Sequence, residues 1–484
     1  MSKNHSEGAA QNTTVMPTHQ RLCMVGSMAL AIGLSILFYM HSLSFPSCCD
    51  ASQYVEMARH FEAHGFGANA PHSDVRTFGY PFLLWLVSSV AVAIGVPFPA
   101  AVFVVQLSMY VACVVLLYFR FLRLFGPAAG LAVYYGLTFN VLLFPYLPLT
   151  MTDGMSVILF LCAAGVLVSL AAGNGLRMTI LCAAVLGFLV GFAVIVRPAN
   201  LWLCALVVIG ALLVYRKRGR ARQQAAGART TRDVVMFIAI AGITGIVATV
   251  PQSALNWMRA HKATPLPIYD LKAKQLDAGV RYIKYGTNMT GERPAGLFYR
   301  NPLFVEAEGR QGIDWYFRAP LRGSMTLVLR MFAGFDFDYL FPYIYDLRPG
   351  YRPVLFLLSQ FIVFFGIGAI ILLMYPTLAR RILGTSAAEH FYWTGPIPAG
   401  QVFITALLGW AAIHAVSAIE NRFTLPMVTM LMPLAVAALW VLIRVFQSGN
   451  IKRGLWIVAG FGLWMAACLP IIRILERAKQ LPFS

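Results

Sequence analysis

The chain has 484 residues, of which 59% are hydrophobic and only 12% are charged. This composition excludes a water-soluble globular protein, because too few polar side chains are available to cover its surface. The net charge of +19 does not indicate a nucleic-acid partner, since the basic residues lie in short loops between apolar runs, where membrane orientation explains them. We therefore predict an all-α polytopic membrane protein.

Eleven apolar runs in the chain are interpreted as membrane spans, since about 20 helical residues cross the roughly 30 Å hydrocarbon layer. The polar segment 1–21 is expected to be a cytoplasmic tail, and the run after it is interpreted as a retained signal anchor. The predicted spans are 22–45, 99–119, 127–147, 153–172, 178–196, 199–215, 233–250, 353–375, 401–418, 424–444 and 454–472.

The apolar run 79–95 is not counted as a span. If it crossed the membrane, Arg120 and Arg123 would lie outside and every later basic loop would be inverted. A helix lying in the outer interface keeps these basic residues in the cytoplasm. The polar residues that this topology places at the outer face are Asp50, His72, Asp74, Arg76, Asp153, Arg197, Glu420 and Arg422.

The same pattern divides the chain into four parts. Residues 1–21 form the tail, and 22–250 form a transmembrane catalytic module that includes a first outer loop at 46–98. Residues 251–352 form a small extracytoplasmic region, and 353–484 form the C-terminal transmembrane helices.

The region 251–352 is expected to act as a lid, with an interfacial helix around Met325 to Phe335. It mixes aromatic and polar side chains, which is typical of carbohydrate sites but also of membrane interfaces. These residues are Tyr282, Lys284, Tyr285, Asn288, Arg293, Asp336, Asp338, Tyr339, Tyr343, Tyr345, Asp346 and Arg348.

Two acids stand at boundaries between loops and helices on the outer side. Asp50 precedes a short predicted helix, 51–63, and could act as a general base or orient a metal ion. Asp153 precedes a long apolar run. Both acids could equally be helix N-caps, a position that Asp fills well, and the two interpretations are compatible.

Three arginines are candidates for binding phosphate. Arg197 ends a span and is followed by Pro198, so a planar bidentate donor is held at the boundary; a snorkelling membrane anchor is the alternative. Arg422 could contact a diphosphate or simply pair with Glu420. Arg76 could bind phosphate or sugar hydroxyls together with His72 and Asp74, or belong to a solvated loop.

The spacing of these residues resembles that of the multi-span GT-C glycosyltransferases, in particular the bacterial branch related to protein O-mannosyltransferases and lipid A aminoarabinose transferases. In that family the first extracytoplasmic loop carries the acidic catalytic residue and two interfacial helices. The resemblance covers about residues 22–200 and, more loosely, Glu420 to Pro426. The residues that carry it are Asp50, Tyr54 and Ala58 at four-residue spacing, Gly65, Arg76, Gly79-Tyr80-Pro81, Thr152-Asp153 and Gly191 to Pro198.

Two positions depart from the family pattern. Cys49 stands where many members have a second acid, and Phe78 stands where the family usually has Pro. A lone carboxylate is a poorer cation site, so dependence on a divalent cation at Asp50 and Asp153 stays open. No other cofactor is expected.

The resemblance implies an inverting transfer of a sugar from a polyprenyl-phosphate donor to a cell-envelope acceptor, which would be a glycan, lipid A of lipopolysaccharide, or a protein. It places the enzyme in a bacterial inner membrane with its active site facing the periplasm. Under it Asp50 is the base, Asp153 supports the base or acceptor, and Arg197 or Arg422 holds the donor phosphate. The other residues assigned to donor or substrate binding are Tyr54, His72, Asp74, Arg76 and Glu420.

Two other functions remain open at this stage. An O-antigen-type polymerase or ligase shares a multi-span body, but such proteins place their key residues in a large late loop, which here would be 251–352. A lipid or solute transporter often shows paired repeats and charged residues at mid-membrane depth. The ionisable residues here gather at one face and no repeat is evident, which disfavours transport.

Overall fold

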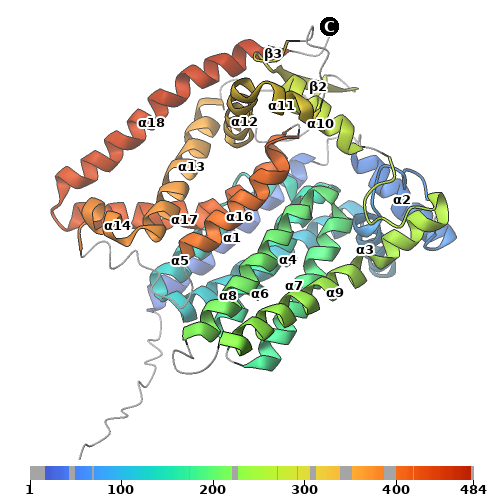
Figure 1. The fold of residues 1–484 in the computed structure, drawn as a ribbon, viewed down its shortest axis with the longest axis horizontal. Coiled ribbons are helices and arrows are strands. Elements are labelled where there is room, and N and C mark those ends of the chain that lie inside the picture. The colour runs from blue at the N-terminus through green and yellow to red at the C-terminus, as the bar shows by residue number, and fades with distance from the viewer. Residues whose placement is uncertain are drawn as a thin grey trace, which may run out of the picture.

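The computed structural model describes residues 17–42, 50–67, 70–173, 175–220, 227–269, 271–290, 293–305, 312–337, 352–385, 399–417 and 419–480, and the structural statements below concern these residues. Most of them are helical (Figure 1). The elements are α1 (Thr18–Ser42), α2 (Asp50–His64), α3 (Gly79–Ile94), α4 (Phe98–Phe125), α5 (Pro127–Thr138), η1 (Phe144–Tyr146), α6 (Thr152–Ala172), α7 (Leu176–Val196), η2 (Pro198–Leu203), α8 (Cys204–Arg220), α9 (Gly227–Ala260), α10 (Leu271–Arg281), β1 (Tyr282–Thr290), β2 (Arg293–Arg300), α11 (Ile313–Arg318), α12 (Pro320–Phe335), α13 (Arg352–Met374), α14 (Pro376–Leu383), α16 (Ala399–His414), α17 (Asn421–Gln447), α18 (Ile451–Ala478) and β3 (Lys479–Gln480).

Nine helical segments of the described chain are long and apolar enough to cross a membrane. They are α1, α4, α6, α7, α8 with its preceding turn η2, α9, α13, α17 and α18. The prediction of a helical, polytopic integral membrane protein is therefore confirmed. Two of the eleven predicted spans are not full-length helices. The run at 401–418 is the 16-residue helix α16, and the run at 127–147 is interrupted.

The interruption follows α5, which ends at Thr138 after 12 residues. Pro145 lies in the short 3-10 turn η1, and it has no N–H group for an α-helical bond. The irregular backbone that results is buried in protein, where its carbonyl groups need partners. Gln106 of α4 supplies them, since its Nε2 donates to the carbonyl oxygens of Leu147 at 3.0 Å and Leu149 at 3.1 Å. The segment between the end of α5 and the start of α6 is therefore largely non-helical.

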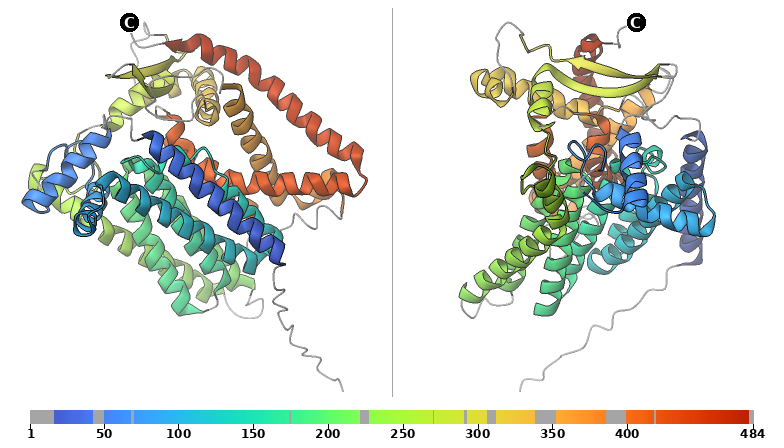
Figure 2. Two further views of the ribbon diagram at one scale, coloured as in Figure 1. Left: turned by 180° about the vertical axis from the view of Figure 1, so that it is seen from behind. Right: turned by 90° about the vertical axis from the view of Figure 1, so that its right-hand side faces the viewer.

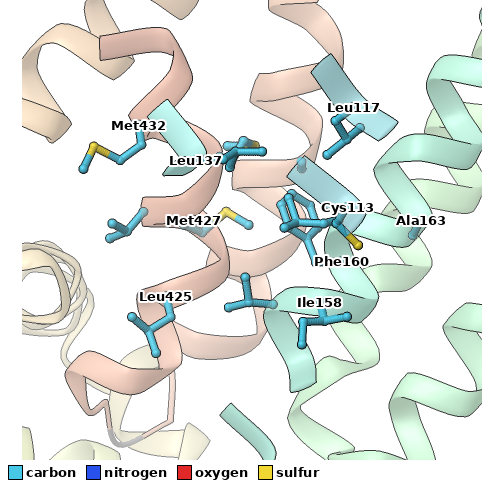
Figure 3. Packing of buried hydrophobic residues seen from close by; sticks show 14 of the residues in the cluster. Cys113, Leu117, Leu137, Ile158, Phe160, Ala163, Leu425, Met427 and Met432 are labelled. Carbon is cyan, nitrogen blue, oxygen red and sulfur yellow. The ribbon is translucent and has the colours of Figure 1, made fainter. Parts of the chain in front are cut away.

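The helix bundle packs around a large apolar core between α4, α5, α6 and α17 (Figure 3). The residues labelled there are Cys113, Leu117, Leu137, Ile158, Phe160, Ala163, Leu425, Met427 and Met432. Within the same bundle α7 and α9 approach most closely, because Gly187 and Gly191 of α7 lie directly against the backbone of Ala241 and Gly245 of α9. Small residues four apart allow such close contact between membrane helices.

The region 251–352 contains a small antiparallel sheet, which the all-α prediction missed. Its strand order is β1-β2-β3, so the last strand comes from the C-terminal end of α18. Figure 2 (right) shows the β1–β2 hairpin crossing one end of the helix bundle. A backbone bond from the N–H of Tyr285 to the carbonyl of Ile419, at 2.9 Å, attaches the hairpin to the turn before α17.

Helix α12 corresponds to the predicted interfacial helix around Met325 to Phe335. Gly323, Thr326, Arg330 and Ala333 form its buried face at spacings of three and four residues. Its end is fixed to α17 because the Asn421 side-chain amide donates to the Gly334 carbonyl at 2.8 Å. The sheet and α12 therefore lie against the same end of α17.

Candidate functional site

Four helix ends meet at one point of the structure and bring together charged side chains from distant parts of the sequence. Asp50 is the first residue of α2, and Asp153 lies in the first turn of α6. Arg197 directly follows α7, and Arg422 lies in the first turn of α17. The loop between α2 and α3 adds Arg76. The sequence predicted that these residues share one face, and the structure brings all five together.

Arg422 is the centre of this cluster. Its Nη2 lies 3.5 Å from Oδ2 of Asp50, and its Nη1 lies 3.7 Å from Oδ2 of Asp153. Its Nε donates to Oε2 of Glu420 at 2.6 Å. The Arg422 side chain is only 9% exposed. A single guanidinium therefore connects three carboxylates that come from three different helix ends.

Two further arginines bind the same acids from the outer side of the cluster. Arg76 donates to Oδ1 of Asp50, and Arg197 donates to Oδ1 of Asp153. Arg197 also lies over the ring of Phe423, 4.6 Å from its centroid, and Arg76 lies 5.4 Å from the ring centroid of Tyr54. Three arginines thus balance three acids, and aromatic rings hold two of the guanidinium groups in place.

The local sequence explains how these groups are placed. Pro198 disfavours helical backbone at the preceding residue, and Arg197 is extended there, with φ −152° and ψ 116°. Gly79 lets the start of α3 lie against the last turn of α7, since a Cβ atom on Gly79 would lie 2.6 Å from the carbonyl oxygen of Ile195. The backbone N–H of Phe78 donates to Oε1 of Gln252 on α9 at 2.8 Å. A proline at position 78 could not form that bond.

Two acids beside Arg422, the partly buried Asp50 and the buried Glu420, differ in how their surroundings affect them. Burial alone would raise the pKa of Asp50, but Arg422, Arg76 and Arg197 outweigh it and lower the pKa below its ordinary value. Burial raises the pKa of Glu420, and the opposing effect of Arg422 does not cancel this shift. Asp50 is therefore ionised at neutral pH, whereas Glu420 is the acid that takes up a proton more readily.

The structure also corrects the two N-cap interpretations in part. Met151 occupies the N-cap position of α6, and Asp153 lies within the first turn with its carboxylate on Arg197. Asp50 likewise lies within the first turn of α2, bound to Arg76. Acids in a first helical turn are favoured by the helix dipole, so a structural role and a chemical role remain compatible for both.

His72 and Asp74 do not join the cluster. The Nε2 atom of His72 lies 2.7 Å from Oε2 of Glu56, on a partly exposed part of α2. The backbone carbonyl of Asp74 accepts a bond from the N–H of Tyr269 at 2.9 Å. The His72 carbonyl accepts the N–H of Arg76 at 2.8 Å. Both residues therefore shape the loop that presents Arg76.

Two tyrosines complete the walls of the site. Tyr80 is 1% exposed, and its hydroxyl has no hydrogen-bond partner among the described residues. It packs edge-on against Tyr54. Tyr285 of β1 packs edge-on against Phe423, and burial raises its pKa. The sequence marked Tyr80 through the Gly-Tyr-Pro motif, whereas Tyr285 was one of twelve weak candidates.

Among those twelve candidates, several lie outside the part of the chain whose side chains the structure describes. They are Asn288, Arg293, Asp338, Tyr339, Tyr343, Tyr345, Asp346 and Arg348. Of the others, Lys284 and Asp336 serve packing within the lid, since Lys284 Nζ donates to the Asp336 carbonyl at 2.7 Å. Asp336 also pairs with Arg352 at 2.8 Å.

The described residues that surround the site do not form a ready set of ligands for a divalent cation. Among the described residues, no three His, Cys, Asp or Glu side chains are grouped as metal ligands. Both Asp50 and Asp153 direct their oxygens at guanidinium groups, with Arg422 between them. A metal ion there would meet three positive charges instead of a free set of oxygens.

No protein-family model matches the chain, and no curated protein matches it. Among solved structures, two are similar to this chain over most of its length, at low sequence identity. The archaeal oligosaccharyltransferase AglB from Archaeoglobus fulgidus, solved with an inhibitory peptide and a dolichol-phosphate, is 11% identical with a TM-score of 0.46 over 96% of this chain and 56% of its own. ArnT from Cupriavidus metallidurans, bound to undecaprenyl phosphate, is 14% identical with a TM-score of 0.38 over 86% of this chain and 78% of its own. The chain thus spans about half the length of the oligosaccharyltransferase.

Proposed function

We propose that the protein is a membrane glycosyltransferase that moves a sugar from a polyprenyl-phosphate donor to a cell-envelope acceptor, at the outer face of a bacterial inner membrane. The observation that carries this proposal is the contact of Arg422 with Asp50, Asp153 and Glu420 at the ends of membrane helices. A lipid-phosphate leaving group needs cationic stabilisation where the apolar layer ends. The acceptor needs a carboxylate at the same place.

The arginines are suited to hold the donor phosphate. Each is positioned by carboxylates or aromatic rings, and Arg197 and Arg422 both lie beside the Phe423 ring. Guanidinium groups bind phosphate through two parallel hydrogen bonds. Because the acids already neutralise the arginines, the phosphate has to replace a carboxylate on at least one of them. Donor binding therefore rearranges the charge pairs of the site.

Asp50 is the proposed base. Its low pKa makes it a weak base while Arg422 and Arg76 are paired with it. When the donor phosphate takes up one of these guanidinium groups, the pKa of Asp50 rises and the carboxylate can accept the acceptor's proton. The acceptor oxygen then bonds to the anomeric carbon, the bond from that carbon to the phosphate oxygen breaks, and the electron pair leaves with the polyprenyl phosphate. Attack opposite the leaving group inverts the anomeric centre.

The isoprenoid tail needs an apolar path from the site into the membrane. A cavity of about 80 Å³ lies among α4, α6, α8, α16 and α17, further along these helices than the charged cluster. Its walls are entirely apolar and include Phe160, Leu206 and Phe403. A cavity of this size takes only a short part of a hydrocarbon chain, since ligand pockets usually measure about 300–1,000 Å³, so most of the tail would lie outside it.

Mass spectrometry of envelope lipids and glycans from a deletion strain tests this function. We expect one transferred group to be missing and to return when the wild-type gene is restored. Asp50→Asn should not restore it, although the protein is expressed and folded. Glu62→Gln is the matched control, since Glu62 is an exposed acid on the same helix, and it should restore the group. Full restoration by Asp50→Asn would refute the assignment of the base.

A polymerase or ligase is a second candidate. It is favoured by the position of the region 251–352, which brings β1 close to the charged cluster. Tyr285 of β1 lies at the charged cluster, held by the backbone bond to Ile419. If the lid carried the chemistry, alanine substitution there would remove activity while Asp50→Asn would spare it. The two series of variants, measured on the same glycan, separate these functions.

A further inference from the structure

We propose that a second site, far from the charged cluster, binds an anionic phospholipid. The site is the cleft enclosed by α13, α14, α17 and α18, which form one side of the molecule in Figure 1. One acyl chain occupies the cleft, and the lipid phosphate lies between Arg381 and Arg453. The proposed transferase activity does not depend on this inference.

The cleft has the size and lining of a lipid site. Its volume is about 540 Å³, within the range of about 300–1,000 Å³ that ligand pockets occupy. Apart from the two arginines, every lining residue is apolar. The lining residues that the argument uses are Phe364, Gly368, Leu442, Trp456, Arg381 and Arg453.

The two arginines are available to an anion. Arg381 lies in the last turn of α14, and Arg453 lies in the first turn of α18. Among the described residues no acid lines the cleft, and neither arginine forms an ion pair with an acid. A positive charge at the start of a helix is disfavoured by the helix dipole, so an anion beside Arg453 would be stabilised by both the side chain and the helix end.

Gly384 fixes where the Arg453 side chain lies. Its φ of 87° ends α14 in a conformation that favours glycine. The Arg453 guanidinium packs directly over the Gly384 Cα, where a Cβ atom would overlap with it. The two helix ends are thereby joined, with both guanidinium groups at one end of the cleft.

This cleft is separate from the catalytic cluster. Along α17, its lining begins at Ala438, 16 residues after Arg422, which corresponds to about 24 Å of helix at 1.5 Å per residue. Its arginines belong to the basic turns that the topology places in the cytoplasm. Basic pockets between membrane helices on that side bind acidic lipid headgroups.

A bound lipid would also explain how α18 is held. Only 6% of its most apolar 18-residue window is buried, compared with 72% for α17. An acyl chain between Trp456 and the walls provided by α13 and α17 would cover part of this exposed surface. Lipid binding should therefore stabilise the folded protein, because a ligand that binds only the folded state raises its stability.

The test uses the full-length protein, delipidated in detergent, and measures its Tm after addition of phosphatidylglycerol, phosphatidylcholine or inorganic phosphate. We expect phosphatidylglycerol to give the largest rise in Tm. The double variant Arg381→Gln/Arg453→Gln should reduce that rise to the level of phosphatidylcholine. Lys452→Gln is the matched charge control, since Lys452 is exposed and does not line the cleft, and it should keep the full rise.

A second pair of variants tests the acyl chain and does not alter charge. A Cβ atom on Gly368 would meet no atom within 4 Å, and Gly368 lines the cleft, so the side chain of Gly368→Trp is expected to extend from α13 into the cleft and fill it. It should remove the response to phosphatidylglycerol, whereas Gly368→Ala should keep it. Equal responses to both phospholipids would overturn the proposal. So would a full response to inorganic phosphate alone, a larger response to a polyprenyl phosphate, or an unchanged response in Gly368→Trp.

Discussion

Replacing Arg422 by glutamine tests whether this one guanidinium holds the charged cluster together. Asp50 would still be paired with Arg76, and Asp153 with Arg197. Glu420 would lose the one side chain, within the described structure, that is hydrogen-bonded to its carboxylate. Since Glu420 is 2% exposed, the variant leaves a buried carboxylate without a partner.

The expected cost follows from that burial. Removing one member of a buried ion pair typically destabilises a protein by about 3–5 kcal/mol, because the other charge stays uncompensated. Burial already raises the pKa of Glu420, and loss of Arg422 raises it further. When the pKa of a carboxyl group is raised in the folded state, the free energy of unfolding of the protein falls as pH rises through that pKa. Arg422→Gln should therefore be more stable at pH 5 than at pH 8.

Thermal unfolding in detergent measures this effect across the pH range. In the wild type the raised pKa of Glu420 gives the same trend, but a smaller one because Arg422 opposes it, and the lowered pKa of Asp50 means that its stabilising charge is lost only at lower pH. The double variant Glu420→Gln/Arg422→Gln removes the uncompensated charge and should recover much of the lost stability. If the double variant is as unstable as Arg422→Gln at every pH, the reasoning about Glu420 is wrong.

Two further substitutions probe how the site is built. Gly79→Ala should cost about 1–3 kcal/mol of stability, the usual cost of overpacking, because its Cβ atom would lie 2.6 Å from the Ile195 carbonyl oxygen. The control in thermal unfolding is Gly67→Ala, whose Cβ atom would meet no atom within 4 Å. Equal Tm values for the two variants would contradict the close approach of α3 to α7. Arg197→Lys keeps the charge but loses the planar guanidinium over the Phe423 ring. Under the proposed function this removes a hydrogen bond to the donor phosphate. Since a hydrogen bond to a charged group contributes about 1.5–3 kcal/mol, the rate of sugar transfer should fall about tenfold or more. Unchanged transfer by a folded Arg197→Lys protein would show that its guanidinium does not hold the donor.

Much of the site could be predicted because charge placement follows membrane topology. The positive-inside rule excluded 79–95 as a span, and this placed Asp50, Asp153, Arg197 and Arg422 on one side. The structure brings the four residues together. The prediction succeeded although 127–147 is not a continuous helix, because α5 and the irregular segment after it still return the chain to the start of α6.

Other features could not be predicted, for physical reasons. Hydropathy measures apolar content, and the segment after α5 is mostly apolar. The side chain that bonds to its free carbonyl groups is Gln106, on a different helix. The β1–β2 hairpin pairs with residues next to the C-terminal end of α18, a contact that local sequence patterns do not indicate. The place of Tyr285 in the site depends on that hairpin, so its role was hidden in a list of aromatic residues.

The balance of charges in the site has a mechanistic consequence under the proposed function. Arg76, Arg197 and Arg422 are each paired to an acid. Before a donor binds, the charges of these arginines and acids therefore balance, and Asp50 is a weak base. A donor phosphate adds negative charge and competes for the same guanidinium groups, which raises the pKa of Asp50 only once the donor is present. The acceptor is thus deprotonated after the donor has bound, and this order limits wasteful reaction of the base with other hydroxyl groups. Under this proposal a single carboxylate suffices for this control, because the arginines that contact Asp50 set its basicity.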